Sequence, residues 1–111
     1  MIREFILTQI FDKNWNLLNL TDEALRQLQS FIMKNPGVGD IIEGTGGLTK
    51  LRWSLYDKGK RGGIRVLYID FIRQKTIIFV NCYSKNEKDS ISDKEKAIYK
   101  DFIKEIGRVL K

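Results

Sequence analysis

The chain has 111 residues, of which 42% are hydrophobic and 11% aromatic. This length suits one small globular domain over residues 1–111 and leaves no room for a second catalytic lobe. Lysine and arginine outnumber aspartate and glutamate by 20 to 14, which gives a formal net charge of +6. An anionic partner is therefore the first expectation.

Missing residue types narrow the possible chemistry. There is no histidine, which removes the usual general base of Ser-His-Asp and Cys-His enzymes and the commonest metal ligand. The acidic residues show no metal-ligand spacing, so we expect no metal and no cofactor. The single cysteine, Cys82, cannot form an intrachain disulfide, and no apolar run is long enough to cross a bilayer. These features predict a cytoplasmic protein with no membrane partner.

The first third of the chain predicts a strand and a helix. Loose alternation of apolar and polar residues predicts a strand over residues 4–11. Helical periodicity predicts a helix over residues 22–34, with Thr21 as its N-cap and an Asn-Pro-Gly sequence at residues 35–37 that ends it. A glycine-rich stretch follows, in which we expect residues 40–43 to form one helical turn.

From residue 48 the period changes to two, which predicts three consecutive strands. They run over residues 48–56, 64–72 and 76–83 and most simply form an antiparallel meander. A capping box at Ser92 and Glu95 opens a last helix. Its apolar positions are expected to face inward: Tyr99, Phe102, Ile103, Ile106 and Leu110. The order of elements predicts a small α+β domain, in which an antiparallel sheet of the N-terminal strand and the meander has the helices packed on one face.

Positive charge is concentrated in the part of the chain assigned to the sheet. Residues 46–88 hold ten Lys or Arg against three Asp or Glu, a net charge of +7, whereas the rest of the chain sums to −1. In the first strand of the meander, Lys50 and Arg52 alternate with apolar residues, so both cations are expected on the face that the core does not use. Arg65 and Lys85 would join them in one cationic patch.

Composition leaves two interpretations of this patch open. Cations on a sheet face are often solubilising groups that bind nothing. Tyrosines beside them, such as Tyr56 and Tyr83, favour nucleic acid, because aromatic rings stack on bases while cations hold phosphates. Tyr68 has the opposite strand parity to Arg65 and is therefore a candidate core residue.

Three segments carry the most specific signal: Gly46-Gly-Leu-Thr-Lys-Leu-Arg-Trp-Ser54, Lys60-Arg-Gly-Gly-Ile-Arg-Val-Leu-Tyr68, and Tyr83-Ser-Lys85 before a capped helix. Together they resemble the HigB branch of the RelE/ParE toxin superfamily, over about residues 36–106. The resemblance implies a small RelE-like domain and the toxin of a type II toxin–antitoxin system. The resemblance further implies a metal-independent mRNA endoribonuclease that acts in the ribosomal A site and is neutralised by a helix-turn-helix antitoxin.

On this resemblance, Lys50, Arg52, Arg65 and Lys85 match the basic catalytic positions of the family. We expect Lys50 to help deprotonate the 2′-hydroxyl of RNA, and Arg52 and Arg65 to stabilise the pentavalent phosphorane. Lys85 would orient the scissile phosphate or stabilise the leaving 5′-oxygen. The partners would be mRNA and the 16S ribosomal RNA of the A site. Further RNA contacts are expected from Lys58, Lys60, Arg61, Tyr83 and Lys88.

One departure from the family pattern concerns proton transfer. RelE places a catalytic tyrosine shortly after the last basic residue, whereas this chain has Ile91 and no tyrosine before Tyr99. Other functions also stay open for this fold. The chain could be a ParE-like toxin that inhibits DNA gyrase without cleaving anything, a non-catalytic RNA-binding domain, or a basic domain whose partner is a protein.

Overall fold

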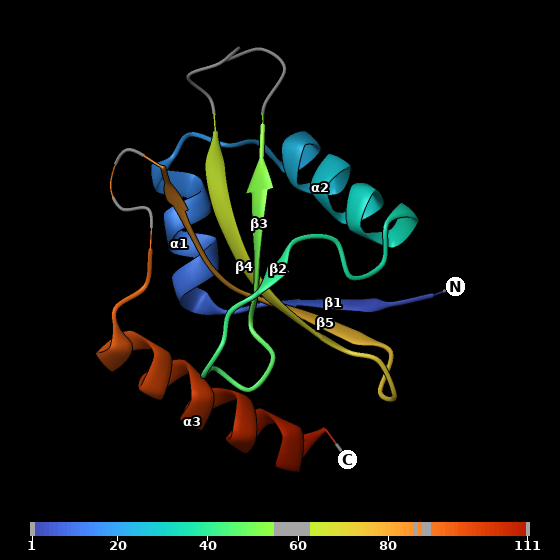
Figure 1. The fold of residues 1–111 in the computed structure, drawn as a ribbon. Helices are drawn as coiled ribbons and strands as arrows, with labels where there is room; N and C mark the ends of the chain where they lie inside the picture. The colour runs from blue at the N-terminus through green and yellow to red at the C-terminus, as the bar shows by residue number, and fades with distance from the viewer. Residues whose placement is uncertain (1, 55–62, 86, 88–89, 111) are drawn as a thin grey trace.

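The structure, a computed structural model, describes residues 2–54, 63–85, 87 and 90–110. Figure 1 shows a twisted sheet with helices on both of its sides. None of the helices in these ranges is long and apolar enough to span a bilayer. The elements in chain order are β1 (Glu4–Leu7), α1 (Gln9–Leu17), α2 (Asp22–Lys34), β2 (Asp40–Ile41), β3 (Thr49–Trp53), β4 (Ile64–Phe71), β5 (Thr76–Ser84) and α3 (Asp93–Val109).

The strands form one mixed sheet in the order β1-β5-β4-β3-β2 (Figure 1). β3, β4 and β5 are antiparallel neighbours, which confirms the predicted meander within an α+β fold. β1 pairs with β5 in parallel, from Glu4 opposite Thr76 to Leu7 opposite Phe79. The expectation of an antiparallel sheet is wrong at this edge. The chain leaves β1 through helices rather than through a hairpin, and a long connection allows a parallel neighbour.

The helices cover both faces of the sheet, so the prediction that they pack on one face is wrong. Phe11 of α1 and Leu28 of α2 lie in one core with Val66 of β4. On the opposite face, Ile103 of α3 lies in a second core with Leu67. Side chains of β4 and β5 alternate between the two cores and are buried over most of both strands. A strand that is apolar on both faces needs cover on both sides.

Helix α1 replaces the second half of the strand predicted over residues 4–11. The strand ends at Leu7, and the Thr8 Oγ1 accepts a hydrogen bond from the Phe11 N–H at 3.1 Å, which caps the helix. Phe11 and Trp15 are four residues apart and face the core from α1. In the sequence, the start of this helical spacing overlaps the end of the strand alternation.

Residues 40–43 contribute to the sheet instead of forming the predicted helical turn. Asp40 pairs with Lys50, and β2 is an edge strand of 2 residues. Gly39 permits this close approach, because its φ is +108° and a Cβ there would lie 2.7 Å from the Lys50 carbonyl oxygen. The pairing depends on a contact between segments and has no local sequence signal.

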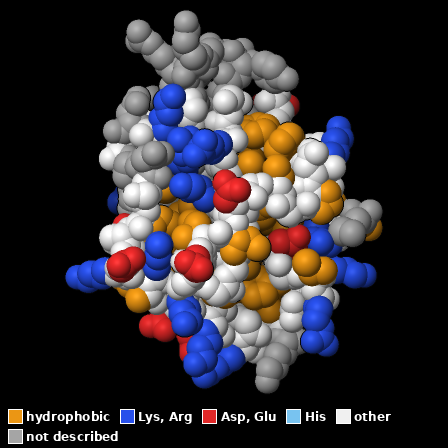
Figure 2. Space-filling view, in the orientation of Figure 1, with side chains coloured by type: hydrophobic (Ala, Val, Ile, Leu, Met, Phe, Trp, Pro, Cys, Tyr) orange, Lys and Arg blue, Asp and Glu red, His pale blue; other side chains and the backbone are white. Residues whose placement is uncertain are grey.

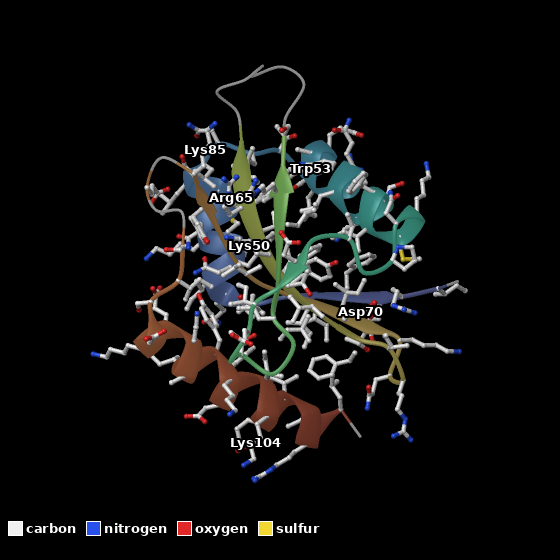
Figure 3. All side chains as sticks on the ribbon, in the orientation of Figure 1. Lys50, Trp53, Arg65, Asp70, Lys85 and Lys104 are labelled. Carbon is white, nitrogen blue, oxygen red and sulfur yellow. The ribbon has the colours of Figure 1, made fainter. Side chains whose placement is uncertain are left out.

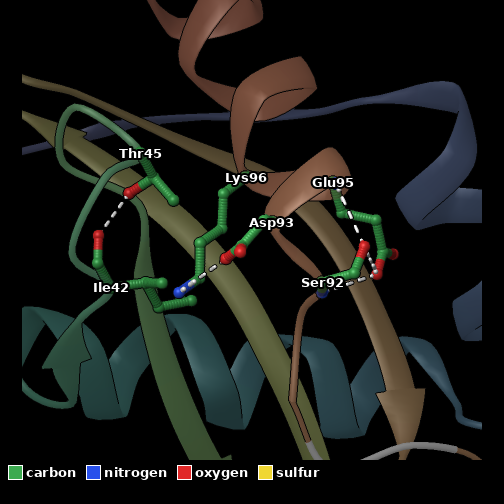
Figure 4. A network of polar contacts seen from close by, with 6 residues as sticks. All are labelled: Ile42, Thr45, Ser92, Asp93, Glu95 and Lys96. Atoms are coloured by element: carbon green, nitrogen blue, oxygen red, sulfur yellow. Dashed lines mark hydrogen bonds and ion pairs between the residues drawn. The ribbon is translucent and has the colours of Figure 1, made fainter.

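Both longer helices begin at the caps predicted from the sequence. The Thr21 Oγ1 accepts a hydrogen bond from the Ala24 N–H at 3.0 Å at the start of α2. At α3, the Ser92 Oγ accepts from the Glu95 N–H at 3.2 Å, and the Glu95 Oε1 accepts from the Ser92 N–H at 3.0 Å (Figure 4). The inward positions predicted for α3 all belong to the second core: Tyr99, Phe102, Ile103, Ile106 and Leu110.

We expect Ser92→Ala to lower the free energy of unfolding by about 1 kcal/mol, because the Glu95 N–H loses its acceptor. Urea denaturation followed by circular dichroism measures this loss. Ser30→Ala is the matched control, since Ser30 is exposed within α2 and its replacement should change stability by less than about 0.5 kcal/mol. Equal losses for the two variants would contradict a stabilising role of the cap.

Candidate functional site

The register of β3, β4 and β5 aligns candidate residues across the sheet. Arg52 lies directly opposite Arg65, and Arg65 lies directly opposite Tyr83. Directly opposed residues on neighbouring strands point to the same face, so these three side chains form one row. Lys50 has the same parity as Arg52 and lies opposite Leu67, which places it on this face next to the row.

Lys85 extends the row beyond the end of β5. Its Cδ lies 3.6 Å from the position that a Cβ on Gly63 would occupy. Gly63 precedes Arg65 by two residues, so the lysine stem lies over the same face. Figure 3 shows Lys50, Arg65 and Lys85 following one another across the sheet. We call the surface formed by Lys50, Arg52, Arg65 and Lys85 the cationic face.

The four cations differ in exposure. Arg65 is only 9% exposed and Lys50 is half-buried, whereas Arg52 and Lys85 are exposed. A buried arginine is held in place by its surroundings, and a guanidinium held in this way loses little conformational freedom on binding an anion. Arg52 faces Arg65, and like charges directly opposite each other on two strands repel. An anion placed between these two groups would relieve the repulsion.

The cationic face adjoins the area that α3 covers. The apolar residues of the second core, including Leu48 of the preceding turn and Leu67 of β4, lie on the same face of the sheet as the cations. In Figure 2, Lys and Arg side chains gather on the side of the molecule seen in Figure 1, near the ends of β3 and β4. This face of the sheet therefore has an apolar part packed against α3 and a charged part beside it, so the expectation that the core does not use the face of Lys50 and Arg52 is wrong.

The turn before β3 is organised around Thr45, which is fully buried. The Thr45 Oγ1 donates a hydrogen bond to the Ile42 carbonyl oxygen at 2.6 Å (Figure 4) and accepts one from the Leu48 N–H at 3.1 Å. These bonds satisfy a polar side chain inside the fold and define where β3 begins. They thereby position Lys50 at the start of that strand.

The two tyrosines of β4 and β5 lie in different cores. Tyr68 is buried on the opposite face from Arg65, as its parity predicted, and its Oη donates a hydrogen bond to the Val38 carbonyl oxygen at 2.6 Å. Burial, and to a lesser extent the charge of Asp70, raises the pKa of Tyr68 to about 12. Tyr83 belongs to the row with Arg52 and Arg65 but is only 7% exposed. This burial leaves little ring surface for the base stacking expected of Tyr83.

Sequence reasoning missed a polar network next to the row. The Asn14 Nδ2 donates a hydrogen bond to the Asn81 Oδ1 at 2.8 Å, and the Asn81 Nδ2 donates one to the Tyr99 Oη at 3.2 Å. Asn81 precedes Tyr83 by two residues, so helices α1 and α3 both reach the sheet beside the cationic face. The available signal was one asparagine in the otherwise apolar run over residues 77–82.

Several expected RNA-contact residues lie outside the part of the chain that the structure describes. They are Lys58, Lys60, Arg61 and Lys88. Tyr56, the other tyrosine considered for base stacking, also lies there. Their roles stay predictions from the sequence and the resemblance.

Comparison with known proteins identifies the family. A protein-family model described as "RelE toxin of RelE / RelB toxin-antitoxin system" matches residues 4–110. The chain belongs to the RelE toxin family. The RelE match extends over every helix and strand given above. It is therefore not limited to the three sequence segments that resemble the family.

Two solved RelE structures show the same fold. A double arginine-to-alanine mutant of E. coli toxin RelE in the free state matches with a TM-score of 0.60 and 13% identity, over 88% of this chain and 96% of that chain. The isolated E. coli RelE toxin matches with a TM-score of 0.52 and 15% identity, over 94% and 98%. At such low identity the likeness concerns the fold, and it confirms the RelE-like α+β arrangement.

Proposed function

We propose that this RelE-family toxin is an mRNA endoribonuclease and that its active site is the cationic face. The observation that supports this most strongly is the register of β3 and β4, in which Arg52 lies directly opposite Arg65 on the face that also carries Lys50 and Lys85. A phosphodiester gains negative charge in the transition state of its cleavage, and such cations stabilise that charge. RNA supplies its own nucleophile, the 2′-hydroxyl, so correct positioning is a large part of the catalysis.

Each cation has a role that its place in the row supports. Lys50, with its amine in the neutral form, accepts the proton of the 2′-hydroxyl while the 2′-oxygen bonds to phosphorus. Arg52 and Arg65 bind the non-bridging oxygens of the phosphorane, and the buried Arg65 contributes most because it reorganises least. The bond between phosphorus and the 5′-oxygen then breaks, and Lys85 stabilises that oxygen as it takes up a proton from water. The products are a 2′,3′-cyclic phosphate and a 5′-hydroxyl.

The partners follow from the same proposal. The sequence motifs around the cationic face support assignment to the HigB branch, with cleavage of mRNA in the A site of the ribosome. Basic residues of the loops would contact 16S ribosomal RNA through phosphate groups, with a steep salt dependence. An active ribonuclease in the cytoplasm requires an inhibitor. We expect a cognate helix-turn-helix antitoxin that covers the cationic face or blocks entry to the ribosome.

Primer extension on an mRNA, with and without translating ribosomes, tests the proposal. We expect the native protein to cut inside codons only when ribosomes are present. Lys50→Ala should slow these cuts about 100-fold, because a general base contributes at least that much. The matched control is Lys104→Ala, since Lys104 is an exposed lysine on α3 away from the cationic face (Figure 3), and its removal should leave the rate unchanged.

Two results would overturn parts of the proposal. The 2′-hydroxyl mechanism would be excluded if cleavage left 5′-phosphate ends and required more divalent metal than the ribosome itself needs. An mRNA that stays intact under every condition would exclude the nuclease. A supercoiling assay with DNA gyrase would then show whether the protein inhibits that enzyme. An RNA-binding measurement would show whether the protein binds RNA without cleaving it.

A further inference from the structure

A pocket lies at the edge of β5, beside the cationic face. β1 ends opposite Phe79, and among the described residues no strand pairs with β5 beyond that point on this side. Helix α1 forms one wall of the space, and the pocket has a volume of about 280 Å³. A single nucleobase fits a pocket of this size. We call it the α1–β5 pocket, and its lining includes Asn14, Leu17, Asn81, Cys82, Tyr83 and Glu87.

Hydrogen bonds in the wall determine which polar atoms the pocket offers. The Cys82 N–H donates to the Asn81 Oδ1 at 2.8 Å, which settles the orientation of that side-chain amide. Asn14 must then present its Nδ2 to the same oxygen, and it does so at 2.8 Å. The Asn14 Oδ1 consequently points away from Asn81 and is an acceptor for a ligand.

Glu87 adds a carboxylate to the same pocket. Its Oε1 accepts a hydrogen bond from the Ser84 N–H at 3.2 Å, which ties the side chain back to the end of β5. Burial, and to a lesser extent the nearby Glu87 charge, raises the pKa of the Cys82 thiol to about 12, so the thiol stays neutral near pH 7. Both oxygens of a carboxylate can accept further hydrogen bonds. Asn14 and Glu87 thus make this pocket rich in acceptors.

These acceptors decide the chemistry of the ligand. A phosphate is disfavoured, because the charge of Glu87 repels it. A neutral planar group with N–H donors and an apolar face against Leu17 is favoured, and nucleobases have both properties. Arg65 and Tyr83 are one strand spacing apart, about 5 Å, and Tyr83 borders the pocket. A nucleotide whose phosphate lies on the cationic face can therefore place its base across β5, in the α1–β5 pocket.

We propose that the α1–β5 pocket binds one base of the RNA held on the cationic face and that it favours guanine, an inference that rests on the proposed function. Guanine carries two neighbouring donors on its pairing edge, N1–H and N2–H, which match the two oxygens of the Glu87 carboxylate. Adenine has one donor and one acceptor there, and the acceptor nitrogen would face the carboxylate. Glu87 is accordingly a specificity-determining residue, and Asn14 accepts a further base N–H.

Binding of uncleavable RNA tests the pocket separately from catalysis. The probes are 2′-O-methyl trinucleotides, AAA and its three variants with a single guanine, and NMR titration reports both affinity and shifts at the side-chain amides of Asn14 and Asn81. We expect one guanine-containing probe to bind about tenfold more tightly than AAA, as a hydrogen bond to a charged group is worth this much. Glu87→Gln should abolish the preference. Glu105→Gln, the same change at an exposed position on α3, should retain it.

The outcomes separate this inference from the proposed function. Equal affinities for all probes, an unchanged preference in Glu87→Gln, or no shift at Asn14 and Asn81 would each overturn the pocket, whether or not the native protein cleaves mRNA. A guanine preference that depends on Glu87 would support the pocket. If the same protein then leaves mRNA intact on ribosomes, the nuclease fails while the base site stands.

Discussion

Arg65→Lys is expected to slow mRNA cleavage about 100-fold while the fold stays intact. Arg65 is 9% exposed and lies between Arg52 and Tyr83 in the row that these three residues form across the sheet. Lysine keeps the positive charge but lacks the planar fork that binds two phosphate oxygens at once. Single-turnover cleavage on programmed ribosomes measures the rate, and thermal unfolding followed by circular dichroism checks that the variant is folded.

The matched control is Arg73→Lys, which makes the same change in the turn between β4 and β5, where Arg73 is exposed. This variant should cleave at the native rate. A native rate for Arg65→Lys as well would mean that charge alone is sufficient at this position. The proposed two-point contact between Arg65 and the phosphorane would then have to be abandoned.

Asp70→Asn is expected to lower the free energy of unfolding by about 3–5 kcal/mol. The Arg3 Nε and Nη2 donate to the two carboxylate oxygens of Asp70 at 3.0 and 3.3 Å, and the two side chains are 5% and 14% exposed. Asp70 lies on β4 (Figure 3), so the pair ties the residue before β1 to β4 across β5. Losing the carboxylate charge leaves a buried guanidinium uncompensated, and urea denaturation measures the loss.

Two further variants distinguish a buried ion pair from an ordinary one. Glu23 and Arg26 form an exposed ion pair, and their side chains are 65% and 66% exposed. Glu23→Gln breaks this pair and should lower the free energy of unfolding by less than about 0.5 kcal/mol. The double variant Arg3→Met with Asp70→Leu should recover most of the stability lost in Asp70→Asn, because apolar side chains need no charged partner. If Asp70→Asn costs no more than Glu23→Gln, the pair does not hold β1 to the sheet.

Helices α2 and α3 could be predicted because their signals are local. Thr21 and Ser92 accept hydrogen bonds from N–H groups three residues later, and the inward residues recur at helical spacing. Helix α1 was missed because its first turn overlaps the alternating pattern of β1. The three residues of overlap, 9–11, are enough to make the start of this nine-residue helix resemble the end of a strand.

The cationic face was predictable in part. Strand parity placed Lys50 and Arg52 on one side, and the structure has them there. The direct opposition of Arg52 and Arg65 depends on the register between two strands. The sequence between those strands does not determine this register, because several turn lengths are compatible with a hairpin there. The α1–β5 pocket was not predictable, since Asn14 and Asn81 are 67 residues apart.

The sequence by itself determined which segments become α2, α3 and the meander, and it determined on which side of β3 the cations lie. These outcomes depend on hydrogen bonds and periodicities among residues close together in the chain. Only the tertiary structure decided that β1 runs parallel to β5, that α3 covers the second face, and that Asn14 meets Asn81 beside the cationic face. These contacts depend on how whole elements pack against one another. Elements joined by long connections can be arranged in many ways that satisfy the same local pattern, and the need to bury both faces of the sheet selects one of them.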